Sequence, residues 1–145
     1  MKKQAYTMIA MIVLVGSMAM AAQAQTSGRT QLIANIPFEF NVGNKTLPAG
    51  EYAVSQVNPS SDRVVLQLRH KEGGAGTMVQ MNSVIGKAPE NAKLIFSRYG
   101  NRYFFAQAWV DGDTSGLQVP KSKAERASEL ASSVKKDYAV ALSRR

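Results

Sequence analysis

The sequence contains no cysteine and only one histidine, His70, among its 145 residues. Without cysteine the fold has no disulfide bonds, so packing alone has to stabilise it, even in an oxidising compartment. A single histidine with no acidic partner near it in the sequence does not make a metal site. A serine hydrolase built on His70 would also need a Gly-x-Ser-x-Gly turn, which the sequence does not contain. We therefore predict no enzymatic activity and no cofactor.

Acidic residues are also scarce, with 10 Asp and Glu against 18 Lys and Arg and a formal charge of +8. A basic chain could meet nucleic acid, anionic lipid or acidic polysaccharide, and charge alone does not choose among them. Among the few carboxylates, we expect Glu39 and Glu51 to approach each other across the first pair of strands. A small secreted hydrolase using such a pair is the alternative to a non-enzymatic protein, and the separation of the two groups would decide it.

Only one long hydrophobic run is present, at residues 8–22. Two lysines precede it, and residues 22–24 fit the small-x-small cleavage pattern of a secretory signal peptide. The run is shorter than the about 20 residues of a membrane-spanning helix. We therefore predict a signal peptide over residues 1–24 and a periplasmic or extracellular protein. Cleavage removes the two lysines and lowers the formal charge from +8 to +6. No cysteine follows the run, which excludes lipid attachment there.

Short alternating segments separated by turn residues fill residues 31–119, after a polar and flexible lead-in at residues 25–30. In the first segment, residues 32–42, every even position is apolar, which is typical of a strand with one buried face. Pro37 cannot donate a ladder hydrogen bond, so we expect this strand at a sheet edge or with a bulge. Comparable patterns predict strands at residues 51–57, 63–70 and 77–84. Together with the hairpin below, they indicate an antiparallel β-sandwich or open barrel of about six strands.

Residues 94–110 form the most aromatic part of the chain and contain the turn pair Gly100-Asn101. A two-residue loop at this pair places Tyr99 opposite Arg102 and Phe96 opposite Phe105. Both faces of the resulting hairpin carry apolar side chains. One face therefore needs a cover other than the main core, or a ligand.

Five aromatic and basic residues of this hairpin region are candidate binding residues. Exposed rings stack on sugars and arginines hold acidic groups, so these side chains could bind a glycan. In the competing interpretation most of the rings belong to the core. The strand motif of RNA-binding domains is absent, so we predict no nucleic-acid partner. The candidates are Arg98, Tyr99, Arg102, Tyr103 and Trp109.

Asp111, Asp113 and Ser115 occupy the first, third and fifth positions of a calcium-binding loop pattern. The twelfth position, where such a loop has a bidentate glutamate, is Ser122. We therefore favour an ordinary polar turn over a calcium site.

Ser122 and Glu125 fit a capping box and predict the start of a helix. Apolar residues then recur at three- and four-residue spacing, so we assign residues 120–145 to a basic C-terminal helix and tail. This helix could cover the second face of the hairpin, or it could contact an anionic membrane surface. The apolar positions are Ala127, Leu130, Ala131, Val134, Tyr138 and Ala141.

Three stretches, IPFEFNVGNKTLPAGEYAV at 36–54, AKLIFSRYGNRYFFAQAW at 92–109 and LQVPKSKAERA at 117–127, resemble an uncharacterised family of small exported bacterial β-rich proteins. The shared pattern is IPFxFxVGxxxLPAGxYxV, then RYGxxYF, then PKSKxE. The resemblance implies export and a single β-rich domain. It implies no activity and no site residue.

These observations predict an exported, non-enzymatic module that binds an envelope protein or an anionic glycan. The alternatives are the small secreted hydrolase and a peripheral envelope protein held by its basic C-terminal helix.

Overall fold

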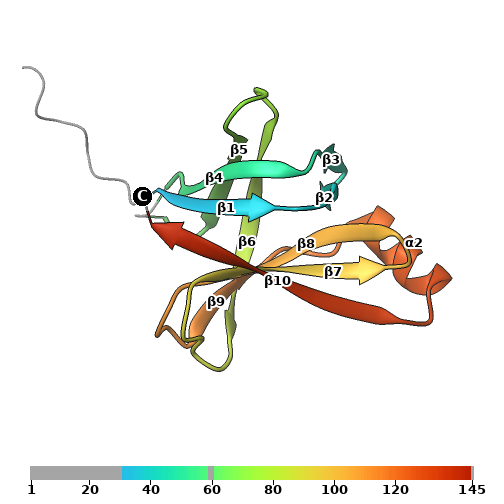
Figure 1. Ribbon diagram of the computed structural model, residues 1–145. Helices are drawn as coiled ribbons and strands as arrows, with labels where there is room; N and C mark the ends of the chain where they lie inside the picture. Colours follow the sequence, from blue (N-terminus) through green and yellow to red (C-terminus); the bar gives the residue numbers. More distant parts are fainter. Residues whose placement is uncertain (1–30, 59–60, 145) are drawn as a thin grey trace, which may run out of the picture.

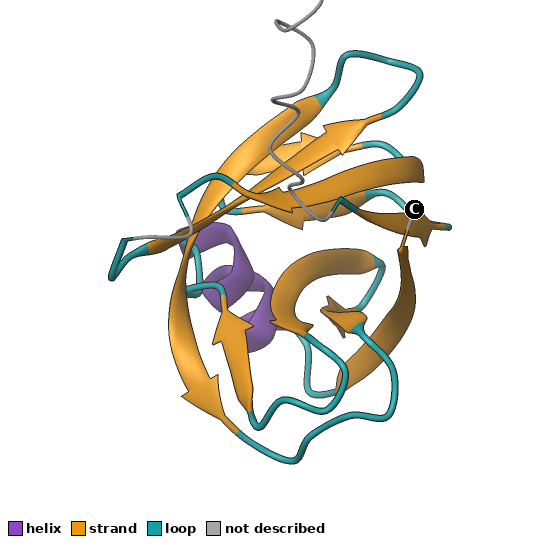
Figure 2. Ribbon diagram, turned by 90° about the vertical axis from the view of Figure 1, so that its left-hand side faces the viewer, coloured by secondary structure: helices purple, strands orange, loops and turns teal. Residues whose placement is uncertain are grey.

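Eight antiparallel strands close into a barrel in the computed structural model, and two more strands form a hairpin attached to it (Figures 1 and 2). The structure describes residues 31–58 and 61–144. The predicted signal peptide, the lead-in at residues 25–30 and Arg145 lie outside these ranges. In the order in which they neighbour one another, the barrel strands are β1 (Leu32–Ile36), β4 (Gly50–Gln56), β5 (Val64–His70), β6 (Gly76–Ile85), β9 (Ser115–Gln118), β8 (Arg102–Trp109), β7 (Lys93–Tyr99) and β10 (Lys135–Arg144), which pairs with β1.

The mainly β character and the short helix near the C-terminal end are confirmed, but the prediction of a sandwich or open barrel of about six strands is wrong. Two strands that the sequence pattern did not predict account for the difference. The four-residue strand β9 bridges the sheet, because Leu117 pairs with both Ser83 of β6 and Ala108 of β8. Strand β10 joins β7 to β1. These two strands convert an open sheet into a closed barrel.

The assignment of a helix to the end of the chain is wrong after residue 131, because residues 135–144 form strand β10. Val140 and Leu142 pack on the core, whereas the alanines between and before them are exposed. This is the period-two pattern of a strand. Alanine tolerates either environment, so the same residues also fitted a helical spacing. The unpaired edges of β1 and β7 then decide the outcome, since β10 satisfies the backbone groups of both.

Pro37 does not mark a sheet edge, and the expectation that it would is also wrong. Strand β1 ends at Ile36, one residue before the proline, and lies between β10 and β4. The chain then leaves the barrel and forms the hairpin of β2 (Phe40–Val42) and β3 (Lys45–Leu47). Because Pro37 stands outside the ladder, its missing N–H costs no hydrogen bond there.

Large side chains close one end of the barrel. Phe40 and Leu47 of the β2–β3 hairpin are fully buried against the barrel, where Phe40 meets the rings of Tyr52 and Phe96 at 5.3 and 5.2 Å. Phe38, in the link between β1 and β2, stacks on Tyr103 with 3.9 Å between ring centroids. We call this the closed end. At the opposite end β1 begins and β10 finishes (Figure 1).

The predicted register of the β7–β8 hairpin is confirmed, with Tyr99 opposite Arg102 and Phe96 opposite Phe105. Beyond Phe96 the register shifts, so Ile95 faces Gln107 rather than residue 106. Because of this bulge, the side chains in the second half of β8 point to the opposite faces from those that a regular strand would give. Ala108 consequently joins the core cluster, and the neighbouring Trp109 lies on the outer face.

Helix α2 (Lys123–Ala131) lies beside the β7–β8 hairpin and contacts its outer face, as Figure 1 shows. The predicted cap is confirmed, because the amide N–H of Glu125 donates to the hydroxyl of Ser122 at 3.1 Å. The face that docks is not the predicted apolar stripe. Glu125 and Ser128 are the buried residues of the helix, whereas Leu130 of the stripe is 90% exposed.

Candidate functional site

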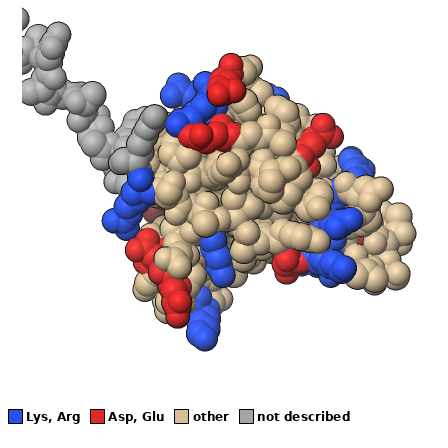
Figure 3. All heavy atoms as spheres, viewed as in Figure 1, with Lys and Arg blue, Asp and Glu red and all other residues tan. Residues whose placement is uncertain are grey.

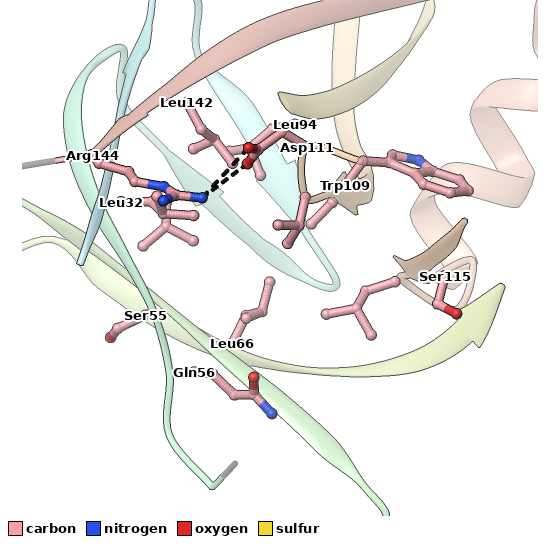
Figure 4. A pocket seen from close by; sticks show the side chains of 14 residues that line it. Leu32, Ser55, Gln56, Leu66, Leu94, Trp109, Asp111, Ser115, Leu142 and Arg144 are labelled. Carbon is pink, nitrogen blue, oxygen red and sulfur yellow. Dashed lines mark hydrogen bonds and ion pairs between the residues drawn. The ribbon is translucent and has the colours of Figure 1, made fainter. Parts of the chain in front are cut away.

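A cavity of about 400 Å³ opens at the end of the barrel opposite the closed end. Its lining comes from the ends of seven barrel strands and from the β8–β9 loop, as Figure 4 shows in part. Nine of the lining residues are apolar and five are polar. They are Leu32, Val54, Leu66, Leu94, Ala108, Trp109, Val110, Leu117 and Leu142, and Ser55, Gln56, Asp111, Ser115 and Arg144.

The apolar walls become less covered from the barrel interior to the mouth. Leu94 is fully buried and Val54 is 4% exposed, so both belong to the packed core. Leu32, Leu117 and Leu142 are only partly buried, although they pack against the same core. Partly covered leucines around a concave space favour an apolar guest, because its entry removes their surface from water.

One ion pair lies at the mouth of the cavity. Arg144, at the end of β10, donates from Nη2 to Asp111 Oδ1 and Oδ2 at 3.2 and 3.5 Å (Figure 4). Both side chains are well exposed, 67% for Arg144 and 43% for Asp111. Exposed pairs of this kind contribute about 0–1 kcal/mol to stability, so the pair breaks at small cost. The sequence pattern placed Asp111 in a possible calcium loop and Arg144 in the basic C-terminal segment, and it did not predict their contact.

The calcium-loop candidates make contacts within the protein. Asp111 faces Arg144, and Asp113 accepts at 2.8 Å from the backbone N–H of Ser115. Within residues 31–58 and 61–144, no three His, Asp or Glu side chains come close enough to bind a metal ion. These contacts are those of an ordinary polar turn.

Tyr99 and Trp109, two of the five candidate binding residues, are buried. Trp109 is 8% exposed, donates from Nε1 to Gln107 at 2.9 Å, and points away from the cavity in Figure 4. Its indole lies against Gly86 and Gly116. Tyr99 is 2% exposed, and its hydroxyl donates to Glu125 of α2 at 3.5 Å. Burial raises the pKa of the Tyr99 phenol. Neither ring is free to stack on a sugar.

The other three candidates surround the closed end and are more accessible. Tyr103 and Arg98 are half-buried, and the guanidinium of Arg98 lies 5.5 Å from the Tyr103 ring centroid. Arg98 also donates to the hydroxyl of Tyr138 at 3.1 Å. Arg102 is exposed. A groove of about 250 Å³ runs along this surface and is lined by Phe38, Glu39, Asn41, Thr46, Asn101, Arg102 and Tyr103.

The two carboxylates that we expected to approach each other have different neighbours. Glu39 lines the groove at the closed end, whereas Glu51 forms an ion pair with Lys71. His70 accepts at Nδ1 from the backbone N–H groups of Glu72 and Gly73, at 3.1 and 3.0 Å. Its role is to stabilise the turn after β5.

The surface offers little to support the membrane alternative. On the face drawn in Figure 3, Lys and Arg form several separate groups with Asp and Glu between them. Within the described ranges, no helix has the length and hydropathy needed to cross a membrane. Leu130 of α2 and Val134, which follows the helix, are exposed. Both are aliphatic, whereas membrane-surface helices typically expose Trp or Phe.

Comparison with models of protein families, with curated proteins and with solved structures found no match. The geometry of the cavity and of the groove is therefore the basis on which a function is proposed below.

Proposed function

We propose that this protein is an exported, non-enzymatic binding protein that holds one small apolar or amphipathic molecule in the open end of its barrel. The observation that carries the proposal is the cavity of about 400 Å³, with its nine apolar lining residues. Closed barrels of eight strands are just wide enough to hold one small ligand when their own side chains leave space. Export is supported by the signal-peptide pattern of residues 1–24.

The size of the cavity limits the ligand. Liquid water occupies about 30 Å³ per molecule, so a space of about 400 Å³ corresponds to roughly a dozen non-hydrogen atoms. This volume lies near the lower end of the range of small-molecule pockets. An alkyl chain of about ten carbons with a small polar head fits this limit.

Titration of the protein with decanol tests the proposal. Net gains of about 0.5–0.6 kcal/mol per non-hydrogen atom are ordinary for small ligands, so for decanol we expect a Kd on the order of 10–100 µM by calorimetry. Ala108→Leu, which adds a larger side chain to the cavity wall, should abolish binding. Leu117→Phe provides a second blocking variant in case the first disturbs the core.

Ala139→Leu is the matched control, because Ala139 is exposed on the outside of β10. It should bind decanol as the unmodified protein does. Absence of binding in the unmodified protein, or unchanged binding in both folded blocking variants, would reject the proposal.

A second candidate function is glycan binding in the groove at the closed end. The specific observation is that the aromatic residues Phe38 and Tyr103 line this groove together with Glu39, Asn101 and Arg102. Sugars are bound by this combination of an aromatic surface and planar polar groups. Co-sedimentation with peptidoglycan tests it, with Glu39→Gln expected to weaken the association and exposed Glu90→Gln as control. Equal sedimentation of both variants would exclude the groove.

A further inference from the structure

We propose that the ligand of the barrel cavity carries a carboxylate, and that this head group binds Arg144 at the mouth while the alkyl chain fills the space below. This inference rests on the proposed function and specifies the class of ligand. It follows from the hydrogen-bonding capacity of Arg144, the weak hold of Asp111 and the charge at the mouth.

Within residues 31–58 and 61–144, Asp111 uses only part of the hydrogen-bonding capacity of Arg144. Both of its hydrogen bonds to Asp111 leave from Nη2. Among the described residues, no acceptor contacts its Nε or Nη1. A guanidinium presents five N–H donors in a planar fork that matches a carboxylate. Arg144 therefore has donors with which to bind a ligand carboxylate as Asp111 leaves.

Asp111 occupies the position that a ligand head group would take, and it is easily displaced. It lies in the β8–β9 loop, outside the barrel wall, and its side chain is 43% exposed. If a ligand carboxylate replaces it, Asp111 returns to water without becoming a buried, unpaired charge. In the empty protein it neutralises Arg144, and the exchange of one carboxylate for another preserves that charge balance.

The remaining groups of the mouth favour an anion over a cation. The other polar lining residues are Ser55, Gln56 and Ser115, and all three are uncharged. They can donate hydrogen bonds to a carboxylate. Asp111 is the one negative charge among the lining residues, and an amine that approached it would have to enter the field of Arg144. The formal charge of the chain, +8 in full and +6 without Lys2 and Lys3, acts in the same direction.

The position of Arg144 also sets the orientation of the ligand. In Figure 4 its side chain lies near Leu32 and Leu142, and Leu66 lies deeper in the same space. A head group at Arg144 therefore places the alkyl chain against the leucines. Decanoate, with twelve non-hydrogen atoms, matches both the cavity limit and this direction.

Calorimetric titration with decanoate, decanol and decylamine at neutral pH and low salt tests the inference. We expect the unmodified protein to bind decanoate several-fold more tightly than decanol, and decylamine most weakly. Arg144→Gln should lower the affinity for decanoate several-fold and leave that for decanol unchanged, because the head group loses its charged partner. Asp111→Asn should raise the affinity for decanoate several-fold by removing the competing carboxylate.

Arg126→Gln is the matched control, since it removes the same charge from the exposed surface of α2. It should leave all three affinities within twofold of the unmodified protein. Equal binding of decanoate and decanol, or an unchanged affinity for decanoate in Arg144→Gln, would overturn the carboxylate assignment while the proposed cavity stands. Failure of all three probes to bind would instead reject the proposed function, and the inference with it.

Discussion

Trp109 owes its place on the outer face of the barrel to two glycines. A Cβ atom on Gly116 would lie 2.6 Å from Cδ2 of the indole, and one on Gly86 would lie 2.6 Å from Cη2. Both distances are far below ordinary contact distances for carbon atoms, and neither glycine needs an unusual φ. These two positions therefore require glycine for the space that it leaves. The indole in turn covers β9, the shortest strand of the barrel.

Gly116→Ala should destabilise the protein by about 1–3 kcal/mol, because the methyl group displaces the indole or the strand beneath it. Urea denaturation followed by circular dichroism measures the change. In a Trp109→Leu background the same substitution should lower the free energy of unfolding much less, because the indole with which the methyl group clashes is absent. An equal cost in both backgrounds would show that the glycine serves another purpose.

At the level of elements, helix α2 docks through polar contacts. Glu125 and Ser128 face the hairpin, where Tyr99 and Arg102 donate to them at 3.5 and 3.3 Å. Burial raises the pKa of the Glu125 carboxyl above its ordinary value of 4.5, and the positive charge of Lys121 opposes this only in part. The folded protein therefore binds a proton at Glu125 more tightly than the unfolded chain does.

The raised pKa of Glu125 fixes the sign of a pH effect. At pH values between the ordinary pKa and the raised pKa of the folded protein, the folded state binds more protons than the unfolded chain. The contribution of Glu125 to the free energy of unfolding is therefore fully present below its ordinary pKa, and it is lost as pH rises through the raised pKa. Glu125→Gln should remove this loss, making the variant more stable than the unmodified protein at pH 7 but not at pH 4. Urea titrations at the two pH values measure it.

Glu129→Gln is the opposite control on the same helix. A hydrogen bond from Lys121 lowers the pKa of the exposed Glu129 carboxyl, so that residue contributes stability above its ordinary pKa and loses it as pH falls. Its substitution should therefore slightly destabilise the protein at pH 7. If the two variants shift stability in the same direction at pH 7, the assignment for Glu125 is wrong.

Local patterns in the sequence predicted the elements whose partners are close in the chain. Gly100-Asn101 fixed the hairpin register, and Ser122 fixed the start of α2. Long-range pairing was beyond such patterns. Whether residues 135–144 form a helix or a strand depends on the edges that β1 and β7 present, and the bulge between Ile95 and Phe96 depends on barrel curvature. The cavity was missed because it reflects how side chains from seven strands fill one end.

At the scale of the whole molecule, the two ends of the barrel differ. The β2–β3 hairpin and the rings of Phe38 and Tyr103 fill the closed end, and the cavity occupies the other. Rigid packing at one end allows the opposite end to stay partly empty without loss of the fold. The groove and the cavity consequently offer independent sites.

Deletion of residues 135–145 tests whether β10 is integral to the barrel. Its removal exposes the edges of β1 and β7 and uncovers the core that Val140 protects, so we expect loss of the cooperative unfolding transition and of decanol binding. Leu130→Ala, an exposed change on α2, should leave both intact. A truncated protein that still unfolds cooperatively and binds decanol would mean that the barrel closes without this strand.

The pairing of β1 with β10 has a kinetic consequence. Leu32 lies opposite Arg144, so the ladder that closes the barrel joins positions more than a hundred residues apart in the chain. Contacts of such long sequence separation slow folding, because a large loop must be ordered before they form. During synthesis, strands β1 to β9 emerge with nothing to close them. The nascent chain therefore keeps the edges of β1 and β7 unpaired until β10 has left the ribosome.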